Sequence, residues 1–277
     1  MNSFVFGSEE FQRELKDNPH HTGEVEFLRS VLRPGMRAIE AGANRGVTAV
    51  AISRQIGAQG HLYALEPVPE FYTELKENLR RNGADNVSAH QLALGNRRGR
   101  IQFYKHGGGS GITPAEDAEG LYVEATTLTD FLREQGEARI DFLNLDCEGS
   151  ELLVLQGARK VLEDHGPQIF CEIHRDYLGK LNQSIGEVAG LLSGLGYEVR
   201  PLRVEELNAE SSVEECSHVY ARKPSRKREM KELKEKIADL KARMPVHSVR
   251  PSMLQELEEL EEQLKSMENG EEWAPDP

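Results

Sequence analysis

The 277-residue chain has few cysteines and no long apolar run. Its three cysteines, Cys147, Cys171 and Cys216, are odd in number and widely spaced, which fits neither a disulfide framework nor a zinc site. The longest aliphatic run, Leu152–Leu155, is far shorter than the ~20 residues of a membrane-spanning helix. Charged residues interrupt Met1–Lys16 before the apolar core of a signal peptide could form. We therefore expect reduced thiols, a cytoplasmic location and no membrane partner.

Basic residues are also in deficit. The chain has 34 lysines and arginines against 47 aspartates and glutamates, a formal net charge of -13. Nucleic acids and anionic lipid surfaces attract proteins that present a basic face. The charge therefore excludes general binding to nucleic acid, and we expect no such partner. The length allows one sizeable domain plus an appendage.

Charge separates the C-terminal residues 222–277 from the rest. Residues 222–250 contain 11 basic and 4 acidic side chains, whereas residues 251–277 contain 1 basic and 9 acidic. Apolar residues recur every three or four positions in both halves, at Met230, Leu233, Ile237, Leu240 and Met244, and at Met253, Leu257, Leu260, Leu264 and Met267. This spacing predicts two helices joined by a link between Pro245 and Pro251.

We predict that these helices form an antiparallel, coiled-coil-like hairpin, with the basic helix against the acidic one. Each helix has only about two and a half heptads, which is marginal for an isolated pair. We therefore expect a homodimer formed through the hairpin; docking on the main domain or on a foreign partner is the alternative.

The remaining residues alternate between strand and helix patterns. Residues 1–35 read as an N-terminal helical segment that ends at Pro34 and Gly35. Strands are then expected at 37–40, 61–66, 87–92, 140–145, 168–173, 198–203 and 217–221. Helices are expected at 47–56, 70–82, 128–135, 151–162 and 185–195. Residues 36–221 should therefore form an α/β domain, with a mostly parallel seven-stranded sheet and helices on both faces.

The first strand ends in a glycine-containing loop, Gly42-Ala43-Asn44-Arg45-Gly46. Its glycines allow a sharp turn and a close approach to a ligand. A dinucleotide fingerprint would need glycines at the positions of Asn44 and Val47, so an NAD-dependent oxidoreductase is disfavoured. Glu40, just before the loop, would repel phosphate and suits a positively charged ligand.

Glu66 closes the second strand and is followed by Pro67. A carboxylate at this place can accept hydrogen bonds from both hydroxyls of a ribose. The two strand ends together describe a cationic ligand that contains a nucleoside, which is the chemistry of S-adenosylmethionine.

With three further motifs, these residues resemble the FkbM family of S-adenosylmethionine-dependent methyltransferases. The further matches are Leu92–Gly95, Ile140–Glu151 continued by Leu155–Ala158, and Cys171–His174. The resemblance covers about residues 36–200 and implies a Rossmann-like class I methyltransferase fold that uses S-adenosylmethionine. It further implies methyl transfer to a hydroxyl of a small-molecule or carbohydrate-like acceptor. We expect the cofactor to contact Glu40, Gly42, Ala43, Asn44, Gly46, Glu66, Pro67, Ala93, Leu94 and Asp146.

Methyl transfer requires alignment of the nucleophile with the methyl group, and a base if the nucleophile is a hydroxyl. Asp146 ends the fourth strand, and Glu172 and His174 end the fifth; these three are the candidate catalytic residues. Asn144 and Glu148 are candidates for contact with the acceptor, although the family commonly has lysine at the position of Asn144. The alternative for Glu148 is favourable interaction with a helix N-terminus, for Asp146 a role only in capping that helix or holding the cofactor, and for His174 a purely structural position.

Two further possibilities stay open. A divalent metal held by Asp146, Glu172 and His174 would be chemically reasonable, but their spacing does not indicate one, so no metal is predicted. The glycine-rich segment Lys105–Gly120 is no P-loop and could be a lid over the acceptor or a surface loop.

The rival function is a catalytically silent cofactor-binding module that recruits partners through the hairpin.

Overall fold

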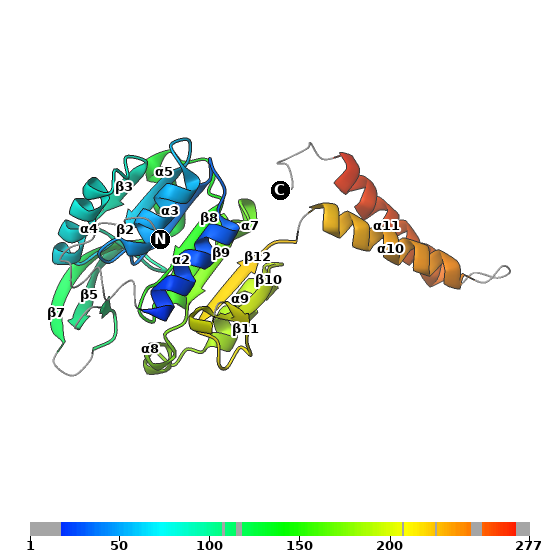
Figure 1. Cartoon of the computed structure of the whole chain (residues 1–277). Coiled ribbons are helices and arrows are strands. Elements are labelled where there is room, and N and C mark those ends of the chain that lie inside the picture. Colours follow the sequence, from blue (N-terminus) through cyan, green and yellow to red (C-terminus); the bar gives the residue numbers. More distant parts are fainter. Residues whose placement is uncertain are drawn as a thin grey trace. The chain divides into compact units, whose positions relative to one another are not determined.

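The computed structural model describes residues 18–106, 109–114, 118–206, 208–224, 226–244 and 251–269. The chain divides into two compact units, Met1–Lys223 and Pro224–Pro277. The first unit is an α/β body and the second is a helical hairpin (Figure 1). No helix in the described ranges is both long and apolar enough to cross a bilayer.

The body is built on an eight-stranded sheet in the order β11-β10-β12-β9-β8-β1-β2-β3. In this order the strands are Ala209–Glu210, Glu198–Arg203, His218–Arg222, Gln168–Glu172, Phe142–Leu145, Arg37–Ala41, His61–Leu65 and Val87–His90. The five strands from β9 to β3 are parallel, whereas β12, β10 and β11 add antiparallel pairs at one edge. The seven predicted strands are present, and the two-residue β11 adds an eighth that the sequence pattern did not indicate.

Helices cover both faces of this sheet (Figure 1). One face packs against α2 (Pro19–Val31), α3 (Val47–Ile56) and α4 (Pro69–Arg81). The other packs against α5 (Leu128–Gln135), α6 (Glu151–Gly157), α7 (Arg159–Asp164), α8 (Arg175–Lys180) and α9 (Ile185–Gly194). Phe142 belongs to the first core and Leu143 to the second, as the alternation of side chains along a strand requires. The Rossmann-like α/β fold is therefore confirmed. The predicted helix 151–162 is two helices, α6 and α7, and α8 was not predicted.

A second, four-stranded sheet was missed by the sequence pattern. Its order is β4-β7-β5-β6, with strands at Ala93–Leu94, Glu119–Thr126, Gly99–His106 and Gly109–Gly111. Phe103, Val123 and Ala125 of this sheet pack with Val68 and Phe71 at the start of α4. The described part of the segment Lys105–Gly120 therefore contributes strands to this sheet rather than forming an irregular loop.

Helix α2 is anchored directly on the body. Asn18 caps its start, since Asn18 Oδ1 accepts a hydrogen bond from His20 N at 3.0 Å, and Pro19 takes the first helical position. A Cβ on Gly23 would lie 1.9 Å from the carbonyl oxygen of Val204, so only glycine allows this approach to the 3-10 helix η1 (Val204–Glu206). The helix thereby brings His20 and Glu24 to the sheet.

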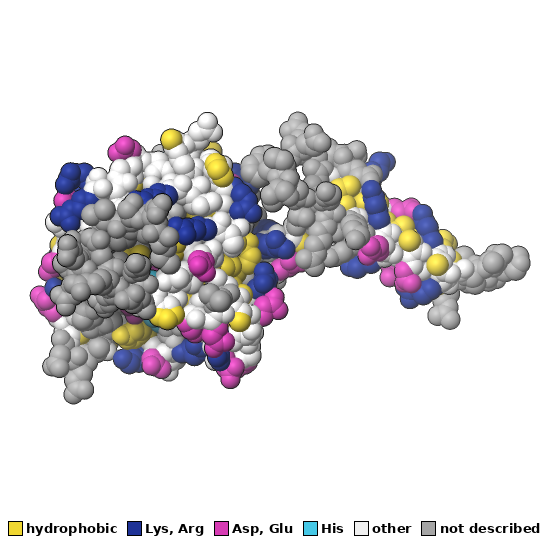
Figure 2. All heavy atoms as spheres, viewed as in Figure 1, with side chains coloured by type: hydrophobic (Ala, Val, Ile, Leu, Met, Phe, Trp, Pro, Cys, Tyr) yellow, Lys and Arg dark blue, Asp and Glu magenta, His cyan; other side chains and the backbone are white. Residues whose placement is uncertain are grey.

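The hairpin consists of α10 (Arg226–Arg243) and α11 (Pro251–Asn269). Leu233, Ile237 and Leu240 of the predicted apolar stripe are buried. Lys241 Nζ of the basic helix lies 2.6 Å from Glu261 Oε1 of the acidic helix. Basic, acidic and apolar side chains are intermixed along its visible face (Figure 2). The predicted hairpin is thus confirmed, although Pro245 lies outside the described residues.

We propose that the hairpin pairs with a second copy of the chain, because Leu254 on α11 keeps 46% of its surface exposed. We expect a homodimer for the full chain and a monomer for residues 1–223, measured by size exclusion with light scattering. Leu254→Asp should weaken the dimer, whereas Gln255→Asp adds the same charge at the next exposed position and should not. A truncated chain that remains dimeric would exclude this interface.

Candidate functional site

A pocket opens at the carboxyl ends of β1, β2 and β8, where the strand order of the main sheet reverses. It holds about 480 Å³ of empty space, including the solvent at its mouth. Its lining consists of Ala41, Gly42, Asn44, Glu66, Pro67, Leu92, Ala93, Leu94, Phe103, Ser110, Asp146, Cys147, Glu148 and Ser150. Ligands of open α/β sheets bind at this position.

Gly42 permits the closest backbone approach in the pocket wall. Its φ is +87°, and a Cβ built on it would lie 1.7 Å from the carbonyl oxygen of Asp146. Asp146 N donates to Ala41 O at 3.0 Å, so the ends of β1 and β8 are held together here. Any side chain at position 42 would separate them.

The buried carboxylate of Glu66 organises the loop after β1. Glu66 Oε2 accepts a hydrogen bond from Asn44 N at 2.9 Å, and Oε1 accepts one from Val68 N at 2.8 Å. Burial raises the pKa of Glu66 to about 7, although both hydrogen bonds act in the opposite direction. Each oxygen retains a second lone pair, and Glu66 lines the pocket. It can therefore accept two further hydrogen bonds from a ligand.

Glu40 and Asn144 lie outside the pocket lining, in contrast to their predicted contacts with cofactor and acceptor. They are paired residues on β1 and β8, and Asn144 Nδ2 donates to Glu40 Oε1 at 3.1 Å. Burial raises the pKa of Glu40 to about 7, and the Asn144 hydrogen bond partly opposes this rise. Ala43 and Gly46 also lie outside the lining, and Gly46 caps α3. The other predicted cofactor residues, together with Glu148, line the pocket.

His174 lies among four carboxylates. Its Nδ1 is 2.7 Å from Glu151 Oε1, and its Nε2 is 3.6 Å from an oxygen of each of Asp146, Glu148 and Glu172. Burial by itself would lower the pKa of His174, but the Glu151 hydrogen bond and the neighbouring negative charges raise it to about 10. The raised pKa favours a protonated imidazole at neutral pH, which suits His174 to hold neighbouring carboxylates better than to serve as a base.

Asp146 is better suited to accept a proton. Burial and the charge of Glu172 raise its pKa above the ordinary value, while the charge of His174 lowers it. Because 37% of the Asp146 side chain is exposed in the pocket, solvent moderates this rise. A carboxylate with a raised pKa is a stronger base than a free one, so Asp146 combines basicity with access to the pocket.

Two neighbouring features complete the pocket wall. Cys147 Sγ donates to Ala41 O at 3.4 Å, and burial raises the pKa of this thiol, so it stays protonated and is no nucleophile. A Cβ on Gly111 of β6 would lie 2.7 Å from the carbonyl oxygen of Glu148. The second sheet therefore closes one side of the pocket, directly against the residue predicted to contact the acceptor.

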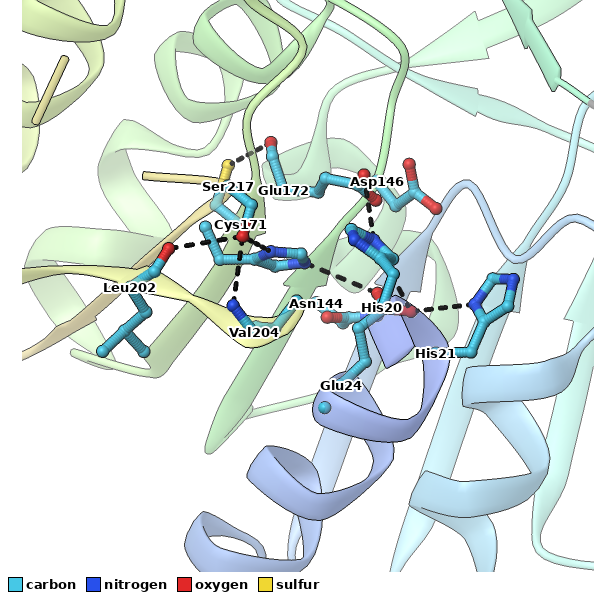
Figure 3. Close-up of polar contacts among 12 residues, drawn as sticks. His20, His21, Glu24, Asn144, Asp146, Cys171, Glu172, Leu202, Val204 and Ser217 are labelled. Atoms are coloured by element: carbon cyan, nitrogen blue, oxygen red, sulfur yellow. Dashed lines mark hydrogen bonds and ion pairs between the residues drawn. The ribbon is translucent and has the colours of Figure 1, made fainter. Parts of the chain in front are cut away.

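Three residues that the sequence pattern did not single out surround Glu172. His20 Nε2 of α2 lies 3.2 Å from Glu172 Oε1 and 3.9 Å from Glu24 Oε2. His218, at the start of β12, places Nε2 3.5 Å from Glu24 Oε1. Figure 3 shows His20 and Glu24 extending from α2 toward the strand ends that carry Glu172 and Asp146. The available signal was the four-residue spacing of His20 and Glu24, which places both on one helix face.

The imidazoles set the charge state of this second group. The hydrogen bond with Glu172 raises the pKa of His20 although burial acts against it. Burial alone would raise the pKa of Glu24, but the neighbouring His21, His218 and His20 hold it below its ordinary value. Glu172 behaves in the same way, since His20 and His174 outweigh its burial.

Residues 40–199 match the model of the methyltransferase FkbM domain. The methyltransferase sdnD of Sordaria araneosa is 30% identical over 205 residues, which cover 60% of this chain and 75% of that protein. The 31-O-demethyl-FK506 methyltransferase FkbM of Streptomyces tacrolimicus is 28% identical over 203 residues, 61% of this chain and 75% of that one. The crystal structure of methyltransferase FkbM from Methylobacillus flagellatus KT is similar over 78% of this chain, at 18% identity and a TM-score of 0.47. The chain spans 56% of that protein.

Substitution of Gly42 tests the close approach in the pocket wall. Gly42→Ala should lower the free energy of unfolding by several kcal/mol, because the new methyl group collides with the backbone and the residue has a positive φ. Gly35 is the matched control: its φ is also +87°, but no atom lies within 4 Å of a Cβ there. Gly35→Ala should cost only about 1 kcal/mol. Equal losses in equilibrium guanidinium unfolding would contradict the collision.

Proposed function

Because the chain belongs to the FkbM methyltransferase family, we propose that it transfers a methyl group from S-adenosylmethionine to a hydroxyl of a small-molecule or carbohydrate-like acceptor. The observation that carries this proposal is the placement of two different carboxylates in one pocket. Glu66 is suited to a ribose, and Asp146 is suited to a proton. The hydroxyl group as acceptor is also the chemistry named for the relative from Streptomyces tacrolimicus.

The pocket residues fit the cofactor. Glu66 lines the pocket and already fixes the Asn44 backbone, so it would accept the ribose hydroxyls. Gly42 leaves the space beside Asp146 free of a side chain. Apolar lining at Pro67, Ala93 and Leu94 is available to the adenine, and the carboxylates favour a positively charged ligand. Ala43 and Gly46 would set the conformation of the loop after β1, and Glu40 on β1 would stabilise that loop.

S-adenosylmethionine supplies a methyl group on a positively charged sulfur, which leaves with the bonding electron pair as a neutral thioether. We assign to Asp146 the acceptance of the proton that the acceptor hydroxyl would lose on methylation. His174, held by Glu151, would position Asp146 and keep it ionised. Glu148 would contact the acceptor from the side that the second sheet closes. In this scheme His174 and Glu172 are positioning residues.

The pH dependence of cofactor binding tests the role of Glu66. Its ionised form accepts hydrogen bonds at both oxygens, and its pKa is about 7. Affinity for S-adenosylhomocysteine should therefore rise about tenfold from pH 6 to pH 8, as the carboxylate loses its proton. Glu66→Gln should bind more weakly and should lose most of this pH dependence in titration calorimetry. Glu70→Gln, an exposed neighbour, should retain it; loss of the pH dependence in Glu70→Gln alone would refute the assignment.

Substitution of Asp146 tests the proton transfer. Asp146→Asn keeps the shape but removes the base, so kcat should fall by about 10² to 10⁴. Affinity for S-adenosylhomocysteine should change by less than about threefold. Turnover is measured as a product heavier by one CH₂ unit, formed from S-adenosylmethionine and a small-molecule cell extract. Asp176→Asn, on an exposed surface of α8, serves as the control and should remain active.

The result also separates the competing functions. Unchanged turnover in Asp146→Asn would remove Asp146 as the base. A large loss of affinity with little change in kcat would make Asp146 a cofactor ligand instead. Cofactor binding without product from any extract would favour the silent, partner-recruiting module.

A further inference from the structure

Four side chains with metal-ligating atoms converge where α2 lies beside the carboxyl end of β9. His20 and Glu24 come from α2, Glu172 ends β9, and His218 begins β12. One ligand atom from each lies within 4.8 Å of the others. Residues 172 and 218 are direct partners in the β9–β12 pairing. The cluster therefore joins a helix and two strands that are far apart in the sequence.

The spacing of these atoms is close to that of a metal site. Ligand atoms at 2.0–2.1 Å from a tetrahedral ion lie about 3.3 Å from one another. Here His20 Nε2 lies 3.2 Å from Glu172 Oε1 and 3.9 Å from Glu24 Oε2, and His218 Nε2 lies 3.5 Å from the other oxygen of Glu24, Oε1. Small side-chain adjustments would bring all four atoms to bonding distance of a single ion.

His218 provides a second, independent indication. The residue is 1% exposed, and its Nε2 makes no hydrogen bond in the described structure. Its ring is fixed by stacking on Phe170, with centroids 4.5 Å apart, and its Nδ1 lies 3.3 Å from Ser217 Oγ. This buried nitrogen lies 3.5 Å from Glu24 Oε1 and so has a long ion-pair contact in place of a hydrogen bond, which leaves its burial poorly compensated. Because Nε2 is directed at Glu24 inside the cluster, a bound cation would satisfy it.

We propose that His20, Glu24, Glu172 and His218 bind one divalent transition-metal ion, with Zn²⁺ as the expected ion. Imidazole and carboxylate are ligands that Zn²⁺ commonly takes. Two carboxylates neutralise the 2+ charge of the ion, and two neutral imidazoles add none, in a place where unpaired charge is costly. Four protein ligands complete a tetrahedron, so the site is structural. His20 is 30% exposed and provides the entrance.

The ion would hold α2 against the end of β9 and the start of β12, and it would orient Glu172. Glu172 also lies 3.6 Å from His174, beside the proposed base Asp146. His20, Glu24 and His218 all lie outside residues 40–199, which match the family model. Three of the four ligands thus come from segments that flank the region matched by the family model, and the ability of the site to bind metal does not depend on the proposed function.

A neighbouring group is the competing location. Asp146, Glu172 and His174 also have ligand atoms within 4.8 Å of one another. The first group offers the larger ligand set, with four residues of which two are histidines, whereas the second offers three residues and one histidine. Because Glu172 belongs to both groups, its substitution cannot distinguish them, and the histidines must be changed separately.

The test uses the full-length protein after removal of metal with a chelator. Titration calorimetry with Zn²⁺ should give one ion per chain, and Co²⁺ should produce the visible absorption of a four-coordinate site. Changes outside the ligand set already weaken metal sites 10–100-fold, so His20→Ala and His218→Gln should weaken binding by at least about 100-fold. The matched control is His21→Ala, which removes an imidazole that contacts the ligand Glu24 but is not itself a ligand, so binding should weaken less than in either ligand variant.

Thermal unfolding provides a readout that is independent of activity. Saturating Zn²⁺ should raise the Tm of the wild type and of His21→Ala, but not that of His20→Ala. His20 is partly exposed, so His20→Ala decides the question even if His218→Gln fails to fold. Absence of stoichiometric binding, or unchanged affinity in His20→Ala, would overturn the proposal. Binding that is lost in His174→Asn and kept in His20→Ala would place the ion at the competing group and would likewise overturn it.

Discussion

The arrangement of side chains at the carboxyl ends of the parallel strands depends on how buried negative charge is compensated. Asp146, Glu148, Glu151 and Glu172 surround a single imidazole, that of His174. Carboxylates withdrawn from water repel each other and are stable only beside a cation or in the protonated form. His174 is therefore held as a cation, and Asp146 is left with a raised pKa where the pocket opens. The same excess of negative charge makes the pocket suitable for a sulfonium cofactor.

The sequence allowed prediction of those parts of the site that depend on local pattern. Gly42 and Glu66 follow apolar strand segments, and both are adjacent to residues that stop a strand, so their position at the sheet edge could be inferred. The pocket lining accordingly contains Gly42, Asn44, Glu66, Pro67 and Asp146. The hairpin was equally accessible, because heptad spacing and charge are visible along a single helix.

Features that depend on contacts between distant segments were not predictable. β8 is buried on both faces, so its pattern does not tell which side Asn144 takes; the structure turns it toward Glu40 and away from the pocket. The sequences of β5 and β7 contain glycines and charged residues, as loops do. Only their pairing in the sheet, with Phe103 and Val123 buried, identifies them as strands. His20 and Glu172 meet only because Gly23 lets α2 lie on the backbone of Val204.

The position of α2 therefore reaches the chemistry through Glu172. Glu172 is shared between His20 on one side and His174 on the other. Any interaction that draws its charge toward His20 reduces its effect on His174 and on Asp146, whose raised pKa owes part of its shift to Glu172. An N-terminal helix outside the family-matched residues can thus tune the proposed base without contacting it. The docking of α2 and the basicity of Asp146 therefore depend on the same charge interactions of Glu172.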